Sequence, residues 1–234
     1  MTASPLKTKL LEITQIGSSR AGVLDIQEKY WPKPGQYLSC QKFTEIPDVL
    51  TTNLFSILGN KGVLTLEPIP QNWTPGDQVQ YLAPQGLAFQ LPSSARWVGL
   101  LPFGVSPLRL LTLVRPALAQ GASLILFLDP EQRDTFLSFV PSSLEVLPLS
   151  ALKDNLDWLD TLAVDIKRED LDVLSNLFLG LTLSITGEVL IRTVMPCHGI
   201  GECGVCSVKT KHGWRLACKD GPVFRLAEIL HVAQ

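Results

Sequence analysis

The sequence is short of charge, and this shortage excludes several kinds of partner. Asp, Glu, Lys and Arg make up 18% of its 234 residues, and the net charge is −2 at pH 7. Nothing in that balance predicts binding to nucleic acid or to an anionic membrane surface. Hydrophobic residues make up 46% of the chain, which is enough to build a large core and to leave apolar surface for a protein partner.

The sequence also lacks a long uninterrupted apolar run. Residues 1–16 show no apolar core followed by a small-residue cleavage site, so we expect no signal peptide. The most apolar stretch, residues 97–114, is broken by Pro102, Pro107 and Arg109, which favour a strand, a loop and a helix over a membrane span. We therefore expect a cytoplasmic protein without a transmembrane segment, whose cysteines are reduced.

The first part of the chain consists of short apolar and β-branched runs. Turns rich in proline and glycine separate several of them, at residues 31–35, 59–62 and 74–77. Many short strands at this spacing are typical of a small antiparallel barrel. We predict an antiparallel β-barrel over residues 1–93.

From residue 94 onward, expected strands alternate with expected helices. The pattern predicts a long helix over residues 106–121, with Ser106 as its N-cap and with a kink or an end at Pro116. Such alternation indicates a parallel, doubly wound α/β sheet of the Rossmann-like kind. We place this domain at residues 94–190 and a small cysteine module at residues 191–234.

Four of the five cysteines gather near the end of the sequence, and only Cys40 precedes them. They follow the spacing C-x5-C-x2-C-x11-C, at Cys197, Cys203, Cys206 and Cys218. A structural zinc site usually has two C-x2-C pairs, and this segment has one. Disulfides would need an oxidising compartment, which nothing in the sequence indicates.

A [2Fe-2S] cluster fits this spacing best. In plant-type ferredoxins one loop supplies three thiolates and a distant segment supplies the fourth. The electron-rich sulfurs need inward-pointing backbone N–H groups, and Gly199, Gly201 and Gly204 can take the φ > 0 conformations that such a loop requires. We predict that the four clustered cysteines hold the iron, and we keep zinc as the alternative. Cys40 is expected to be a small buried hydrophobe.

Two stretches of the segment resemble a known family. MPCHGIGECGVC (residues 195–206) and CKDGPVF (residues 218–224) are similar to the C-terminal module of the dihydroorotate dehydrogenase electron-transfer subunit family, although His198 lengthens the first gap by one residue. This family is ferredoxin reductase-like. The resemblance implies an FAD-binding barrel, a nucleotide-binding α/β domain and a [2Fe-2S] module. It also implies electron exchange between NADH, FAD, the cluster and a flavin-containing dehydrogenase subunit.

The FAD motifs of that family are partly present. KPGQYL (residues 33–38) looks like the Pro-Gly-Gln-aromatic strand of the group, but NLFSI has Asn53 where the family has an arginine for the FAD diphosphate. In GVLT, Leu64 replaces a glycine that lets backbone N–H groups approach phosphate. The resemblance implies these FAD-binding candidates: Tyr37, Asn53, Phe55, Ser56, Gly62 and Thr65. Packing inside a barrel would also account for several of them.

The nicotinamide motifs are altered further. The glycine-rich turn of the family reads LLPFGVSP here, so that Gly104 and Pro107 match and the turn that cradles phosphate is largely gone. The Cys-Gly-Pro that lies beside the nicotinamide in the family aligns with residues 164–166, where none of the three is kept. We do not expect NAD(P)H binding, and we assign no catalytic residue.

These observations predict an electron-transfer subunit that relays electrons through the [2Fe-2S] cluster to or from a partner oxidoreductase subunit. FAD is the second candidate cofactor. Two alternatives remain: a scaffold subunit that docks the cluster in a larger complex without binding nucleotides, and a zinc-stabilised interaction protein. We do not expect the chain to oxidise NAD(P)H by itself.

Overall fold

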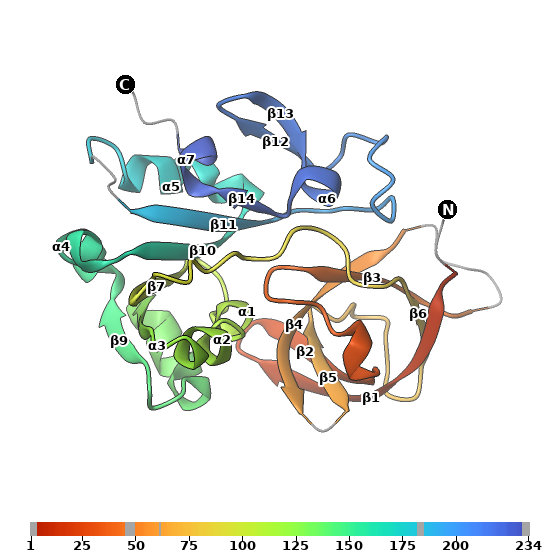
Figure 1. Ribbon diagram of the computed structural model, residues 1–234. Helices are drawn as coiled ribbons and strands as arrows, with labels where there is room; N and C mark the ends of the chain where they lie inside the picture. Colours follow the sequence, from red (N-terminus) through yellow and green to blue (C-terminus); the bar gives the residue numbers. More distant parts are fainter. Residues whose placement is uncertain (1–3, 45–49, 61, 182–184, 231–234) are drawn as a thin grey trace.

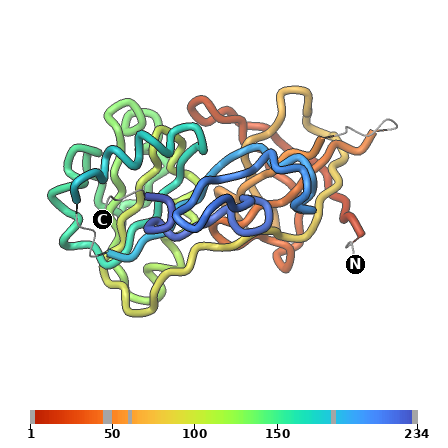
Figure 2. Tube along the Cα trace, turned by 90° about the horizontal axis from the view of Figure 1, so that it is seen from above, coloured from red at the N-terminus to blue at the C-terminus, as the bar shows by residue number. Residues whose placement is uncertain are grey.

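The structure is a computed structural model that describes residues 4–44, 50–60, 62–181 and 185–230. A barrel and an α/β sheet lie side by side, and the C-terminal segment lies across both (Figures 1 and 2). The predicted fold class is confirmed. In the described part of the chain the longest helices have seven residues, and no helix there is long and apolar enough to cross a membrane.

Six antiparallel strands close into a barrel in the order β1-β2-β5-β4-β3-β6. Their bounds are β1 Leu6–Ile16, β2 Ser19–Asp25, β3 Tyr37–Lys42, β4 Thr52–Asn60, β5 Val63–Glu67 and β6 Gln78–Tyr81. Side chains alternate between the two faces of a strand, and each strand sends an apolar residue into the barrel interior: Leu10, Leu24, Leu38, Leu54, Leu66 and Val79.

The second body is a six-stranded sheet in the order β14-β11-β10-β7-β8-β9. Five strands are parallel, and β14 is antiparallel to β11. The strand bounds are β7 Trp97–Pro102, β8 Ser123–Leu128, β9 Glu145–Pro148, β10 Thr161–Lys167, β11 Thr186–Arg192 and β14 Val223–Arg225. The α-helices beside these strands are α1 Leu108–Leu111, α2 Val114–Ala119, α3 Pro130–Phe136, α4 Leu152–Asn155 and α5 Leu171–Leu177. Short 3-10 turns lie at Glu28–Tyr30, Leu137–Phe139, Leu149–Ala151, Leu156–Trp158 and Arg168–Asp170.

The predicted helix over residues 106–121 is two short helices, α1 and α2, and this part of the prediction was wrong. The break between them precedes Pro116, which lies in the first turn of α2. Proline is tolerated there because the N–H groups of a first turn have no partner within the helix. Ser106 does act near the start of α1, where its Oγ accepts the backbone N–H of Leu108 at 3.3 Å.

The C-terminal segment is built into both bodies. It forms the hairpin of β12 (Ser207–Thr210) and β13 (Gly213–Leu216), then α6 (Ala217–Asp220), β14 and α7 (Leu226–Ile229). Strand β14 joins the main sheet, and Cys206 and Cys218 lie in one apolar cluster with Tyr37, Phe55 and Val189. The division of the chain into three domains at residues 93 and 190 stays a prediction.

Candidate iron–sulfur site

The structure brings the four predicted ligands together. The Cys197 thiol interacts with those of Cys203 and Cys218, and the Cys218 thiol also interacts with that of Cys206. The four thiols therefore lie near one another. Three of them come from the loop after β11 and the fourth comes from α6, as the spacing predicted.

The loop that carries the first three cysteines is shaped by left-handed backbone. His198, Gly199, Gly201 and Gly204 have φ values of 52°, 79°, 82° and 70°. This conformation turns the N–H groups of Gly199 and Gly201 onto the Cys197 sulfur. Burial opposes the charged thiolate, but these N–H groups and the neighbouring thiols together lower the pKa of Cys197 below its ordinary value. The loop is thus a cradle for negatively charged sulfur.

The four cysteines differ in exposure. Cys206 is 1% exposed and Cys218 is 5% exposed, whereas Cys203 lies at the surface and Cys197 is half-buried. Burial raises the pKa of Cys218 to about 12, and the adjacent Cys206 and Cys197 thiols add to the effect. One side of the site therefore lies in the apolar core and the other faces solvent.

Residues from the barrel hold this loop in place. Tyr37 is fully buried and donates its hydroxyl to the Cys218 carbonyl at 3.4 Å. Burial, followed by the Cys218, Cys206 and Cys197 thiols, raises the pKa of Tyr37, so the hydroxyl keeps the proton that it donates. Asn53 donates Nδ2 to the Met195 carbonyl at 3.1 Å, just ahead of the first ligand.

Further anchors were missed by the sequence analysis. Gln85 donates Nε2 to the His198 carbonyl at 3.3 Å, and Ser39 Oγ lies 3.2 Å from His198 Nδ1. On the α/β side, Arg168 donates Nη1 to the Val205 carbonyl at 2.6 Å. These partners are 37 to 159 residues apart in sequence, so no local pattern could have revealed them.

Two cavities flank the cysteine loop. One of about 610 Å³ lies on the barrel side, with His198, Ile200 and Gln85 in its lining. The other, of about 590 Å³, lies on the α/β side, with Val205 and Trp214 in its lining. Ile200, Val205 and Trp214 expose much of their apolar side chains. Apolar surface therefore surrounds the solvent-facing edge of the loop.

The donor set fits an iron–sulfur cluster. As the side chains lie, no group of three or more His, Cys, Asp or Glu residues that could hold a metal ion is found among the described residues. Even so, four thiols meet in one place, and backbone N–H groups point at one of their sulfurs. Soft thiolate donors of this kind suit iron–sulfur clusters and zinc.

The six FAD candidates fall into two groups. Tyr37, Asn53 and Phe55 are buried; the rings of Tyr37 and Phe55 lie 5.9 Å apart, and the segment of Met195 and Cys218 covers them. The remaining three, Ser56, Gly62 and Thr65, are partly exposed on β4, β5 and the turn before β5. Only this second group presents surface that a bound flavin could contact, and the assignment of all six stays a prediction.

Comparison with known proteins defines the class of this site. Residues 193–230, which include all four clustered cysteines, match the family model of the iron-sulfur cluster binding domain of dihydroorotate dehydrogenase B. This part of the chain therefore resembles an iron–sulfur cluster binding domain, and it follows the barrel and the strands β7 to β11 in sequence.

Three known proteins are similar to this chain in sequence. The electron transfer subunit of dihydroorotate dehydrogenase B (NAD(+)) from Desulforamulus reducens is 24% identical over 170 residues, which cover 64% of each chain. The corresponding subunit from Clostridium acetobutylicum is 58% identical over 36 residues (15% of this chain, 14% of that protein). Sulfhydrogenase 1 subunit gamma from Pyrococcus furiosus is 48% identical over 42 residues (18% of this chain, 14% of that protein). The matched regions span less than two thirds of each relative's length. The resemblance to dihydroorotate dehydrogenase electron-transfer subunits, inferred from the sequence, is confirmed.

Solved structures share the fold. A chain of the NADH-dependent reduced ferredoxin-NADP oxidoreductase superposes with a TM-score of 0.71 and 16% identity, over 97% of this chain and 91% of that one. A ferredoxin NADP+ reductase from Neisseria gonorrhoeae with bound FAD and NADP gives 0.55 and 16%, over 76% of this chain and 92% of that one. At these identities the likeness shows the fold alone.

Proposed function

We propose that this chain is the electron-transfer subunit of a larger oxidoreductase and that Cys197, Cys203, Cys206 and Cys218 hold a [2Fe-2S] cluster. The observation that carries the proposal is that the Cys218 thiol of α6 lies near the three thiols of a loop whose backbone N–H groups point at sulfur. A bound cluster of this kind takes up and releases one electron at a time. The match to an iron-sulfur cluster binding domain and the electron-transfer subunits among the relatives support the role.

The cysteine spacing favours two irons over one zinc ion. Cys197, Cys203, Cys206 and Cys218 contain one C-x2-C pair, whereas a structural zinc site usually has two. The N–H groups of Gly199 and Gly201 stabilise negative charge on the Cys197 sulfur. Hydrogen bonds to sulfur and exclusion of solvent are what set the potential of such a centre, and this chain supplies both.

A partner subunit would dock over the solvent-facing edge of the loop. Cys203 lies there, with the apolar side chains of Ile200 and Val205 beside it and that of Trp214 on the neighbouring hairpin. Exposed apolar patches of this kind mark protein interfaces. The relatives are named as subunits of dihydroorotate dehydrogenase B and a sulfhydrogenase, and we infer a flavin-containing dehydrogenase subunit as the partner. A cytoplasmic location, expected from the sequence, is part of this proposal.

FAD is the candidate second cofactor, since a reductase with bound FAD shares the fold. The side chains of Ser56 and Thr65 and the backbone of Gly62 would hold the flavin. The scaffold alternative is favoured by a different observation, namely that Tyr37, Asn53 and Phe55 are enclosed within the protein itself. The flavin content of the purified protein decides between the two.

The test is a visible and EPR spectrum of the chain purified without oxygen, together with iron, sulfide and flavin assays. A [2Fe-2S] protein shows broad visible bands that dithionite bleaches, with two irons and two sulfides per chain expected. Acid-released flavin at about one per chain would establish FAD, and its absence would favour the scaffold. A colourless protein that contains zinc and no iron would refute the relay.

Substitution of one ligand tests the assignment of the cysteines. Cys203→Ser should abolish the visible bands, because the site loses a soft thiolate ligand. The protein should still fold, because Cys203 is exposed and lies outside the core. Cys40→Ala is the matched control: it removes a cysteine that is buried in the barrel interior, in a different apolar cluster from Cys206 and Cys218, and should keep the full iron content. Equal iron in Cys203→Ser and the wild type would contradict the ligand assignment.

A further inference from the structure

The order of strands in the main sheet defines where an α/β fold of this kind binds nucleotides. From β7 the chain runs to β8 and β9 on one side, and then returns to β10 and β11 on the other. Open α/β sheets bind ligands outside the carboxyl ends of the strands at such a reversal. In this chain that place lies beyond Pro102 at the end of β7 and Lys167 at the end of β10.

Charged side chains from both bodies fill this place. Arg109, on α1 just after β7, donates Nε to Asp165 Oδ2 at 2.6 Å and pairs through Nη1 with Glu67 of the barrel. Arg192, at the end of β11, donates Nε to Asp165 Oδ1 at 2.7 Å. We call these four residues the ionic cluster: Glu67, Arg109, Asp165 and Arg192. The side chains of Glu67 and Asp165 are 0% exposed and that of Arg109 is 6% exposed.

The ionic cluster is neutral overall, and among its polar atoms Glu67 Oε2 and Arg192 Nη2 are buried without a hydrogen-bond partner in the described residues. Two guanidinium groups face two carboxylates. Burial opposes the charge of Arg109, but Asp165 and then Glu67 outweigh this effect and raise the pKa of Arg109. The backbone closes the same place, because the Phe103 N–H donates to the Asp165 carbonyl at 2.8 Å. A diphosphate could reach Arg109 only by separating buried ion pairs, which would leave a buried carboxylate without its partner.

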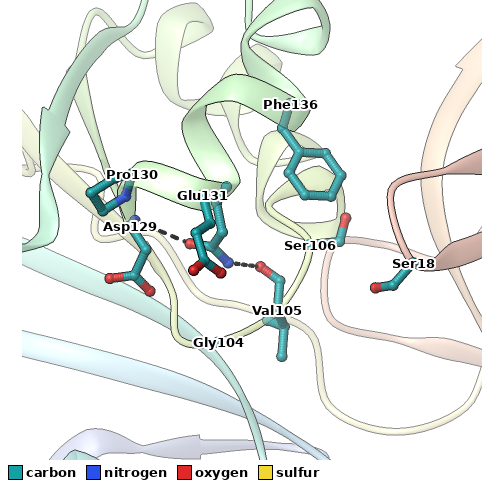
Figure 3. Close-up of a pocket in the computed structure, with 9 residues that line it drawn as sticks. Ser18, Gly104, Val105, Ser106, Asp129, Pro130, Glu131 and Phe136 are labelled. Carbon is teal, nitrogen blue, oxygen red and sulfur yellow. Dashed lines mark hydrogen bonds between the residues drawn. The ribbon is translucent and has the colours of Figure 1, made fainter.

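The adjoining cavity offers a diphosphate no replacement for those cations. It has a volume of about 530 Å³ and lies at the carboxyl ends of β7 and β8, between Gly104 and Ser106 of one loop and α3 (Figure 3). The charged side chains in its lining are two carboxylates, Asp129 and Glu131. The Val105 carbonyl is held by the Gln132 amide. This lining repels an anion, although a carboxylate here could still bind a ribose.

We propose that the ionic cluster occupies the nucleotide crevice in place of a nicotinamide dinucleotide, so that electrons enter this chain singly from a redox centre on another protein. The proposal rests on the proposed electron-transfer function. In each transfer the donor protein's centre loses one electron and the iron–sulfur site gains it, with no hydride and no proton exchanged. Arg109 links α1 to the barrel strand β5, and the same ion pairs therefore lock the two bodies together.

The first test offers NADH and NADPH to the cluster-loaded full chain without oxygen. We expect neither nucleotide at 1 mM (about the upper end of typical KM values) to bleach the visible bands, and titration calorimetry to detect no binding, whereas dithionite bleaches the bands fully. Bleaching by either nucleotide, or measurable binding, would overturn the proposal. The two hypotheses fail separately: absence of iron and of bleaching by dithionite refutes the proposed function, while calorimetry still reports on the crevice.

The second test concerns the ion pairs that join the barrel to the α/β sheet. Arg109→Met should lower Tm by about 5 °C or more, because two buried carboxylates lose a partner, and should raise hydrogen exchange along β5 and β10. Arg115→Met, on exposed α2 surface, is the matched control and should leave both unchanged. If Arg109→Met does not fold, Arg192→Met, which lies nearer the surface, should show a smaller fall in Tm. If the Arg109 or Arg192 variant has the Tm and the hydrogen-exchange rates of the wild type, the ion pairs do not hold the two bodies together.

Discussion

At the scale of single residues, Tyr37 shows how the barrel serves the cysteine segment. Its ring is fully buried against Phe55, and its hydroxyl reaches the backbone of Cys218 across 181 residues of sequence. The family resemblance assigns Tyr37 to a flavin, whereas in the structure its polar atom is already used inside the protein. A residue can thus match the family motif in sequence while its side chain contacts another part of its own chain instead of a flavin.

Tyr37→Phe should therefore destabilise the protein by about 0.5–1.5 kcal/mol, because the Cys218 carbonyl loses a buried donor while the ring packing remains. Urea unfolding measures this change. Tyr30→Phe is the control, since that ring packs edge-on against Tyr81 on the barrel side, away from the cysteines. Equal stability of the Tyr37 variant and the wild type would show that the hydroxyl does not hold the loop.

At the scale of elements, a carboxylate ties together the starts of two parallel strands. Asp160 precedes β10, and its Oδ2 accepts the backbone N–H groups of Arg96 and Trp97 at 2.7 and 2.9 Å, at the start of β7. The Arg96 N–H, and then that of Trp97, lowers the pKa of Asp160 below its ordinary value. The charged form therefore stabilises the register of the two central strands.

A carboxyl whose folded pKa is lowered stabilises the protein above its unfolded pKa, and this contribution is lost as the pH falls through the folded value. We expect Asp160→Asn to be less stable than the wild type near neutral pH, and the difference to shrink below about pH 4. Urea unfolding at several pH values measures it. Asp157→Asn, in the exposed turn just before it, is the matched control, and a stability difference for Asp160→Asn that does not change with pH would contradict the mechanism.

At the scale of the whole molecule, one apolar cluster contains residues from all three predicted domains, while the barrel interior forms a cluster of its own. Cys206 and Cys218 of the C-terminal segment share one apolar cluster with Tyr37 and Phe55 of the barrel and with the main sheet. The ionic cluster adds a second link between the barrel and the sheet. Parts joined in this way should lose their structure together.

The metal-free chain should accordingly unfold in one cooperative transition. Hydrogen exchange measured along a urea series should show the barrel strands and the parallel strands losing protection at the same urea concentration. The far-UV circular dichroism transition should coincide with both. A barrel that stays protected after the sheet has exchanged would show that the two bodies fold independently.

The sequence was informative where the determinants are local. Barrel strands, alternating strands and helices, and a cysteine loop with Gly199, Gly201 and Gly204 all follow from patterns within a few residues, and the structure contains each of them. The ionic cluster and the Tyr37 contact could not be predicted, because their partners lie 27 to 181 residues apart and meet only in the folded chain. The sequence predicted a kink or an end at Pro116, and the break lies a few residues before it, because proline has no N–H to donate to the carbonyl four residues earlier.

The unequal exposure of the four cysteines also bears on how the protein is assembled and damaged. Cys206 and Cys218 are enclosed by the fold, whereas Cys203 lies at the surface. A carrier that delivers iron and sulfide to the already folded chain would meet Cys203 first, because Cys206 and Cys218 are buried. Under the proposed ligand assignment, Cys203 is also the thiol that peroxide would reach first, so oxidative loss of the centre would begin there.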